Sequence, residues 1–480
     1  MAHERSANGE RQYHHGRIHH NNPCPIRTET TGIRVIVVGL GLGGLTAAIE
    51  CYRNGHDVIA LERNDEIRGV GGDCISITSN GARVVSKWGD GAVHANLVDR
   101  MCRATKVQAF NDRGELLNEN DLWGYRKGTG YTTNRGELVT ILFRHLQTLD
   151  VDIRLNSCVT ELWETDEEAG VVINEDLRLS ADCVICSDGI HSMGRAVISR
   201  EEPRVRASGF SGFSSRIDTD EVAKDPQANW FLKDMEQSGG DKAQTWFGDG
   251  VQFMMMTLRG GLDLVWVFSY KDSVATYDFS PATGASVDNV VELIKDWPVR
   301  AKLEPILRKT PANAIYHRQH VFTYPLKTWV SPRRRMFLMG DAAHAVCSVV
   351  GQGGNQAIED GAVAAIALKL AGKGNEPLAL QVTEKIRYQR AVTIQLGCLA
   401  PLEVVSDFKD KDPRLLAPPR HSWIFEHDCQ EYVYREFTKV AQAVQDGTEY
   451  IPQNLPDGGA YRLDYDYCGH LGHKHTHHST

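Results

Sequence analysis

Three glycines form the first pattern in the chain whose spacing could serve chemistry. Gly39, Gly41 and Gly44 follow the apolar run at the start of RVIVVGLGLGGLTAAIE. In such a turn the first glycine permits the tight bend, the second lets a pyrophosphate approach the backbone, and the third lets the following helix pack closely on the strand. The helix N-terminus adds unpaired N–H groups and the positive end of a dipole. The stretch therefore predicts a site for a phosphate-bearing ligand.

An acidic residue closes the next apolar run, HDVIALE. It is Glu62, 18 residues after Gly44, a position from which a carboxylate accepts hydrogen bonds from ribose hydroxyls. Arg63 follows directly and could stack on or bond the adenine, or could be an ordinary surface charge. The order of strand, glycine turn, helix, strand and acid predicts a bound dinucleotide, but it does not separate NAD from FAD.

Three later stretches narrow this choice, because together they resemble a known family. They are TNRGELVTIL with Arg135, CSDGIHSMGR with Asp188, and MGDAAHAVCSVVGQGGNQAIEDG with Asp341. With the first turn they resemble the FAD-dependent monooxygenases related to p-hydroxybenzoate hydroxylase and salicylate hydroxylase, the group A flavoprotein monooxygenases. The late segment WIFEHDCQEY is similar to the fungal natural-product members of that family.

The resemblance implies FAD as the cofactor and assigns residues to it. Arg135 would contact the flavin nucleotide, Asp341 would bond ribityl or ribose hydroxyls, and Asp188 would lie near both FAD and the nicotinamide donor. Gly353 and Gly354 precede a helix, so their backbone N–H groups can face the flavin ring or its pyrophosphate.

The neighbourhood of the flavin ring shows both a match and departures. Asp73 and Cys74 stand where the family has small residues beside the isoalloxazine, whereas Asn80 matches. Asp73 is expected among the cofactor-binding residues. Ala345 and Ser348 replace two family prolines, the second of which lies beside the flavin. No second glycine turn appears in the chain, so NADPH or NADH is expected to bind transiently on the surface of the FAD domain.

The activity that the resemblance implies is the insertion of one oxygen atom from O2. NADPH or NADH would reduce the FAD, and a C4a-hydroperoxyflavin would hydroxylate or epoxidise an electron-rich substrate in a water-excluding site. The expected substrate is a small aromatic, enol or indole-type molecule of fungal secondary metabolism. The alternative is a non-oxygenating flavoprotein, either a dehydrogenase or a catalytically degenerate FAD-binding interaction protein.

Arg216, in GFSGFSSRID, is the predicted catalytic residue. Many fungal members have an arginine there that faces flavin and substrate, and a guanidinium could hold a phenolate or carboxylate. The competing interpretation is a solvent-facing strand arginine. His344 could relay a proton, although packing is favoured, and the methionines 254–256 could line an adaptable pocket, although a strand core is favoured.

Composition argues against several other classes of function. The formal net charge is -9 and no long basic run appears, which argues against nucleic acid or a membrane surface as a partner. No apolar run approaches the roughly 20 residues of a membrane helix. The 11 scattered cysteines and the lack of an apolar N-terminal segment predict reduced thiols and a cytoplasmic protein. The expected oligomeric state is a monomer or a homodimer, and the sequence does not decide between them. Cys183 and Cys186 form C-x-x-C, but their surroundings favour a strand over a redox or zinc site.

The elements that must position these residues predict an α/β fold. We expect a Rossmann-like FAD-binding domain, interrupted by an α+β, sheet-rich substrate domain and followed by C-terminal helices. The expected ranges are 1–31 for a disordered tail, 32–200 for the first part of the FAD-binding domain, 201–328 for the substrate domain, 329–372 for the returning part, 373–450 for the C-terminal helices and 451–480 for a flexible tail. No metal site is predicted, and metal binding by the histidine-rich tails is left open.

Overall fold

The structure of the chain is a computed structural model. It describes residues 27–67, 74–122, 130–201, 205–272, 285–348, 351–397 and 422–456. Most of the two tails that were expected to be disordered, including their histidines, lies outside these ranges, and so does Asp73.

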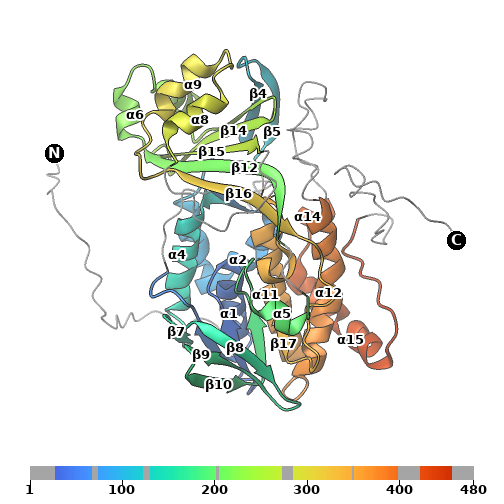
Figure 1. Ribbon diagram of the computed structural model, residues 1–480. Coiled ribbons are helices and arrows are strands. Elements are labelled where there is room, and N and C mark those ends of the chain that lie inside the picture. Colours follow the sequence, from blue (N-terminus) through green and yellow to red (C-terminus); the bar gives the residue numbers. More distant parts are fainter. Residues whose placement is uncertain are drawn as a thin grey trace.

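A five-stranded parallel sheet forms the centre of the lower part of the molecule (Figure 1). Its order is β17-β11-β1-β2-β7, from strands β1 (Arg34–Val38), β2 (Asp57–Leu61), β7 (Asp152–Arg154), β11 (Cys183–Cys186) and β17 (Met336–Leu338). Because both faces are covered, its central strands are continuously apolar. The last strand returns from far along the chain and pairs with β11, so the α/β fold class is confirmed.

Two long helices pack against each other beside this sheet. They are α1 (Leu42–Arg53) and α11 (Gly353–Ala371), and α11 also packs on α12 (Glu376–Gly397) and α15 (Cys429–Asp446). The alanine-rich sequence of α11 gives it a buried surface over most of its length, which permits this close contact on several sides. Two small antiparallel sheets complete this part: β3 (Cys74–Ile77) with β6 (Tyr131–Asn134), and β8 (Val159–Glu164), β9 (Ala169–Ile173) and β10 (Leu177–Ala181).

A seven-stranded sheet lies across the other end of the molecule (Figure 1). Its order is β16-β12-β15-β14-β13-β4-β5, from strands β4 (Lys106–Asn111), β5 (Leu116–Asp121), β12 (Val205–Asp218), β13 (Ala243–Gly248), β14 (Val251–Leu258), β15 (Asp263–Lys271) and β16 (Tyr316–Thr323). Strands β4 and β5 come from inside the range 32–200 yet pair with this sheet through β13. The exact domain ranges stay a prediction.

Four helices pack on the outer face of the large sheet and close a separate hydrophobic core that is rich in aromatic residues (Figure 1). They are α6 (Asp220–Lys224), α7 (Trp230–Ser238), α8 (Val287–Leu293) and α9 (Arg300–Leu307). The other elements are α2 (Ser79–Val85), a 3-10 turn (Trp88–Gly91), α3 (Ala92–Val98), α4 (Arg135–Leu146), α5 (Gly194–Ile198), α10 (Asp341–His344) and α14 (Ser422–Phe425). The inner face of the sheet is turned to β3, with which β15 is in contact.

Candidate active site

The glycine turn between β1 and α1 has the geometry that its spacing predicts. Gly39 has a φ of 87°, and a Cβ there would lie 2.7 Å from the carbonyl oxygen of Ser187. A Cβ on Gly44 would collide with the carbonyl oxygen of Gly39, so the helix start and the strand end touch. Around Gly41, in contrast, a Cβ would meet no atom within 4 Å. The close packing therefore lies behind the turn, and its front is open to a ligand.

Glu62 closes β2 and is joined to this turn. Its Oε2 atom accepts a hydrogen bond of 2.9 Å from the backbone N–H of Leu40, and its Oε1 atom accepts one of 3.0 Å from that of Asn64. The side chain is largely buried, and a carboxylate has room for further donors such as ribose hydroxyls. Arg63 is exposed. Burial, and then the charge of Arg63, lower the pKa of His191, which places Arg63 near the segment that follows β11.

Asp188 stands two residues beyond the end of β11, next to Gly39. A Cβ on Gly39 would lie 3.0 Å from the Cα atom of Asp188. One carboxylate oxygen, Oδ2, accepts a hydrogen bond of 3.0 Å from the N–H of Met193. The other, Oδ1, is buried and has no hydrogen-bond partner among the described residues. Burial raises the pKa of this carboxyl group, and a ligand hydroxyl that donated to Oδ1 would relieve the unpaired position.

A second helix N-terminus meets the first. A Cβ on Gly354 would lie 2.7 Å from Cδ2 of Leu42, the first residue of α1. A Cβ on Gly353 would lie 3.9 Å from Oδ1 of Asp341, whose side chain is exposed. Neither α1 nor α11 has a side-chain hydrogen bond to cap its start. Two uncapped helix starts therefore lie together, and their N–H groups and dipoles favour an anion.

These features all gather at the carboxyl ends of β1, β2, β11 and β17, the usual ligand position of an open α/β sheet. Eight of the predicted cofactor residues are brought together there, and we call this group the nucleotide cradle: Gly39, Gly41, Gly44, Glu62, Asp188, Asp341, Gly353 and Gly354. The open front of the turn, the unpaired Asp188 oxygen and the paired helix starts fit a dinucleotide with a negatively charged diphosphate.

The remaining predicted cofactor residues are less closely joined to this group. Arg135 begins α4 and is exposed, directly after β6, whose Asn134 pairs with Cys74 of β3. Arg135 is therefore close to β3, the strand that begins directly after Asp73. Asp73 lies outside the described residues.

Arg216 lies at the junction of the large sheet and α4, and it is not simply turned to solvent. Its Nη1 atom is 3.0 Å from Oε1 of Glu137 on α4, and its Nη2 atom is 2.8 Å from Oδ2 of Asp263 on β15. Burial opposes the charge, but the two carboxylates raise the pKa of the guanidinium. Sequence analysis did not predict these acidic partners: Glu137 joins the sheet to α4, whereas Asp263 fixes Arg216 within the sheet.

The methionines of β14 divide between the two faces of the large sheet. Met255 belongs to the aromatic core beneath the outer helices, as the strand-core interpretation predicts. Met254 and Met256 point to the inner face, where Met256 is part of a smaller apolar cluster and Met254 packs against it. The Sδ atom of Met256 is 3.8 Å from the Sγ atom of Cys74 on β3. With Val265 and Val267 they form an apolar floor opposite the start of β3.

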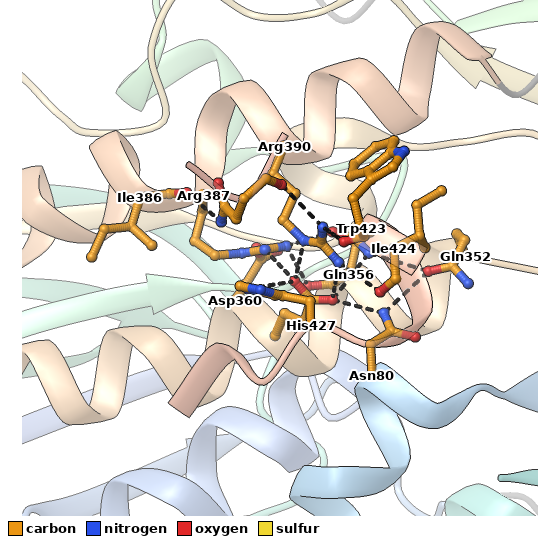
Figure 2. A network of polar contacts seen from close by, with 12 residues as sticks. Asn80, Gln352, Gln356, Asp360, Ile386, Arg387, Arg390, Trp423, Ile424 and His427 are labelled. Atoms are coloured by element: carbon orange, nitrogen blue, oxygen red, sulfur yellow. Dashed lines mark hydrogen bonds and ion pairs between the residues drawn. The ribbon is translucent and has the colours of Figure 1, made fainter. Parts of the chain in front are cut away.

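Behind the cofactor-binding segments lies a buried network of charges that sequence reasoning missed (Figure 2). Glu359 receives hydrogen bonds from Arg387 and Arg390 of α12, and from Asn80 Nδ2 at 2.7 Å. The same Asn80 nitrogen is 3.2 Å from Oε1 of Gln352, the residue directly before α11. The sequence did contain a sign of this network, because the acidic pair Glu359 and Asp360 stands inside the mainly apolar, alanine-rich sequence of α11.

His344 belongs to this network. Its Nε2 atom is 2.6 Å from Oδ2 of Asp360, which also accepts a hydrogen bond of 3.0 Å from the N–H of Gly340. The ring is buried and packs on Trp329. The favoured interpretation of His344 as a packed residue is confirmed, and Asp360 joins its ring to the N–H of Gly340, the residue before Asp341.

Cys183 and Cys186 lie in β11, as predicted, and both are buried with a pKa well above the usual range because of burial. Among the residues that the structure describes, no three side chains of His, Cys, Asp or Glu gather in a way that could hold a metal ion. Within the same residues, no helix has both the length and the hydrophobicity needed to cross a bilayer.

Comparison with known proteins agrees with this geometry. The family model described as FAD binding domain matches residues 32–392. The FAD-dependent monooxygenase okaB of Penicillium ochrochloron is 42% identical over 439 residues, covering 90% of this chain and 97% of the relative. The asperlicin C monooxygenase of Petromyces alliaceus is 39% identical over 434 residues, covering 89% of this chain and 93% of the relative.

Solved structures show the same fold. The crystal structure of CtdE in complex with FAD and substrate 4 has a TM-score of 0.80 and 40% identity, covering 86% of this chain and 100% of that chain. A salicylate hydroxylase substrate complex, with a TM-score of 0.66 and 18% identity, shares the fold, and covers 86% of this chain and 98% of its own. The chain therefore belongs to the FAD-binding domain family and is an FAD-dependent monooxygenase.

Proposed function

We propose that the protein uses NADPH or NADH and O2 to hydroxylate or epoxidise an aromatic, enol or indole-type molecule of fungal secondary metabolism. The observation that carries this proposal is the apolar floor of the large sheet, built from Met254, Met256, Val265 and Val267, opposite the strand that adjoins the nucleotide cradle. Such a surface suits a flat, mainly apolar substrate and excludes water from its reacting face. Relatives that are FAD-dependent monooxygenases over nearly the whole chain support the reaction class.

We assign the cradle residues to FAD by their positions. Glu62 would accept ribose hydroxyls, and Asp188 and Asp341 would accept hydroxyls of the ribityl chain or diphosphate-linked sugar. The starts of α1 and α11, at Gly41 and Gly353, would face the diphosphate and flavin. Bound FAD supplies hydride acceptance and oxygen activation.

Two arginines complete this assignment. Arg63 would stack on or bond the adenine, and Arg135 would contact the flavin nucleotide. Both side chains are exposed, which leaves them able to turn toward a ligand. Within the described ranges only the β1–α1 connection has the glycine turn of a dinucleotide site, so the nicotinamide donor would bind on the surface of this same part.

Arg216 would place a positive charge at the edge of the apolar floor. Its side chain is 24% exposed, so part of the guanidinium can meet a substrate while Glu137 and Asp263 fix its position. A cation held in this way favours the anionic form of a phenol or enol, which is the more electron-rich and therefore the more reactive form.

The proposal is tested by product mass spectrometry. Purified, FAD-loaded protein is incubated with NADPH or NADH and O2, first with asperlicin C, on which a named relative acts, and then with extracts of the organism that makes the protein. We expect a product heavier by one oxygen atom, with the label carried over from ¹⁸O2. Consumption of the nicotinamide with stoichiometric hydrogen peroxide and no oxygenated product would instead favour a non-oxygenating flavoprotein.

A further inference from the structure

Three polar side chains form a chain of hydrogen bonds where the large sheet meets the segment between α10 and α11. The Nε2 atom of His320 on β16 is 3.1 Å from Oγ of Ser269 on β15. Its Nδ1 atom is 3.0 Å from Oγ of Ser348, which follows α10. One imidazole therefore bridges the sheet and the cofactor-binding part.

The ring of His320 lies on the inner face of the sheet, and a glycine makes room for it. Gly212 of β12 pairs with Ser269 of β15, which in turn pairs with Gln252 of β14. Because side chains alternate along a strand, the row of Gly212, Ser269 and Gln252 lies on the inner face of the sheet, as Met254 and Met256 do. A Cβ on Gly212 would lie 3.0 Å from both Cε1 and Nε2 of His320. The imidazole thus sits at the polar edge of the apolar floor.

Ser348 brings this chain of bonds to the cofactor side. It stands between Asp341, at the start of α10, and Gly353, at the start of α11, the two cofactor-binding segments of the returning chain. Unlike Ser269, which is buried, Ser348 is exposed. Its hydroxyl can therefore meet a ligand that lies between the apolar floor and the cradle, while its hydrogen bond to His320 persists.

We propose that Ser348 is a catalytic residue that takes the acidic O–H or N–H proton of the substrate and passes its own hydroxyl proton to Nδ1 of His320. The electron pair of the broken bond stays on the substrate oxygen or nitrogen, and the imidazole becomes a cation whose Nε2–H donates to Ser269. After turnover His320 returns the proton through Ser348 to solvent. This inference rests on the proposed function, because the anion is the form that favours oxygen insertion.

The first test needs no turnover and uses 4-nitrophenol, whose phenolate absorbs visible light. At one pH unit below the pKa of the free probe, roughly a tenth of it is ionised. We expect the FAD-loaded protein to bind the probe mainly as phenolate, and the variants Ser348→Ala and His320→Gln to shift the bound probe clearly toward the free ratio, with Arg216 intact in both. Ser348→Thr keeps the hydroxyl and should keep the effect.

Controls separate the proton transfer from damage to the site. Ser238→Ala removes an exposed hydroxyl at the end of α7 and should leave the probe spectrum unchanged. The FAD content of every variant is read from its visible absorbance. Equal ionisation in the original protein and in Ser348→Ala overturns the proposal, as does failure of the probe to bind at millimolar concentration.

The second test uses the substrate found by product mass spectrometry. Ser348→Ala should lower kcat by about 10²-fold with little change in KM, because general base catalysis typically contributes at least this much. Unchanged kcat overturns the proposal. If no oxygenated product forms with any substrate, the proposed function fails, whereas the nitrophenol spectra still report on Ser348 and His320.

Discussion

The buried network around Glu359 and the cluster around Arg216 consist of the same chemical groups in different surroundings. In the first, the side chains of Glu359, Arg387 and Arg390 are all 0% exposed. In the second, the side chain of Arg216 is 24% exposed and that of Glu137 15%. Both join arginines to carboxylates across elements that are far apart in the sequence. Only the second cluster can still reach a ligand.

The surroundings decide what each cluster can do. Burial alone would raise the pKa of Glu359, but the charges of Arg390 and Arg387 hold it well below its usual range. Arg390 also donates to the backbone oxygens of Trp423, at 2.6 Å, and Ile424, at 2.9 Å. The charged side chains of this network have no contact with solvent, and their hydrogen bonds hold α11, α12 and the segment at α14 together. The cluster around Arg216 keeps part of its surface exposed and is therefore suited to orient a substrate.

The largest effect is expected on removing the charge of Glu359. The substitution Glu359→Gln leaves two buried guanidinium groups with Asp360 as the nearest remaining carboxylate partner. Breaking a buried ion pair in this way costs about 3–5 kcal/mol of unfolding free energy, because the remaining charge is neither solvated nor compensated. Urea-induced unfolding followed by circular dichroism measures the loss, and a low soluble yield would point the same way.

A matched change in an exposed ion pair serves as the control. Glu221 pairs with Lys224 at 2.7 Å, and both side chains are 70% exposed. Glu221→Gln should leave the unfolding midpoint unchanged, since such pairs are solvated whether or not they meet. If Glu359→Gln were as mild as Glu221→Gln, the network would not be holding these elements together.

The buried network should also make the protein sensitive to mild acid. Burial, and then the charge of Arg390, lower the pKa of His427 to about 3. The unfolded chain binds a proton at this residue near pH 6.5. Between these values the unfolded state holds more protons than the folded state, so the free energy of unfolding falls as the pH falls. The expected slope is about 1.4 kcal/mol per pH unit.

A second buried histidine adds to this slope. His56, whose pKa burial lowers to about 4, contributes in the same direction between pH 6.5 and 4. Urea midpoints at pH 7, 6 and 5 measure the sum, in a window above the range where buried carboxylates titrate. His427→Gln removes the contribution of this histidine, so the free energy of unfolding should fall less steeply with falling pH in the variant. An identical slope in the variant would show that His427 does not stay neutral in the folded protein.

Much of the cofactor side could be predicted from the sequence because its signals are local. The glycines at 39, 41 and 44 act within one turn, and Glu62 closes the very next strand, so their spacing carries their geometry. The strand character of Cys183 and Cys186 was likewise visible in a short window. The division of the methionines between two faces follows from simple alternation once β14 is known.

The partners of the charged residues could not be predicted, because they are set by long-range pairing. Arg216 meets Glu137 only because the large sheet lies against the start of α4. His320 meets Ser348 only because β16 runs beside the segment between α10 and α11. Likewise, β4 joins the large sheet by pairing with β13, from much later in the chain. No periodicity within one segment records such contacts.

The smallest change in stability is expected at Arg216, together with a clear loss of activity. Arg216→Ala should cost at most about 1 kcal/mol of unfolding free energy, since the ion pairs are partly solvated and Arg259 still reaches Asp263 at 3.1 Å. If the guanidinium orients the substrate anion, coupled turnover should fall by about 10²-fold. The measurements are urea unfolding and the ratio of oxygenated product to nicotinamide consumed.

Glu137→Gln separates these two roles, because it repeats at this junction the substitution made at Glu359. The amide oxygen of the new side chain would still accept a hydrogen bond from Arg216, and Asp263 would keep the guanidinium in place, so the loss should stay under about 1 kcal/mol and turnover should change little. A turnover loss in Glu137→Gln as deep as in Arg216→Ala would mean that the ion pair positions the sheet and that the guanidinium does not contact the substrate. A stability loss equal to that of Glu359→Gln would mean that the junction is as closed to water as the network behind it.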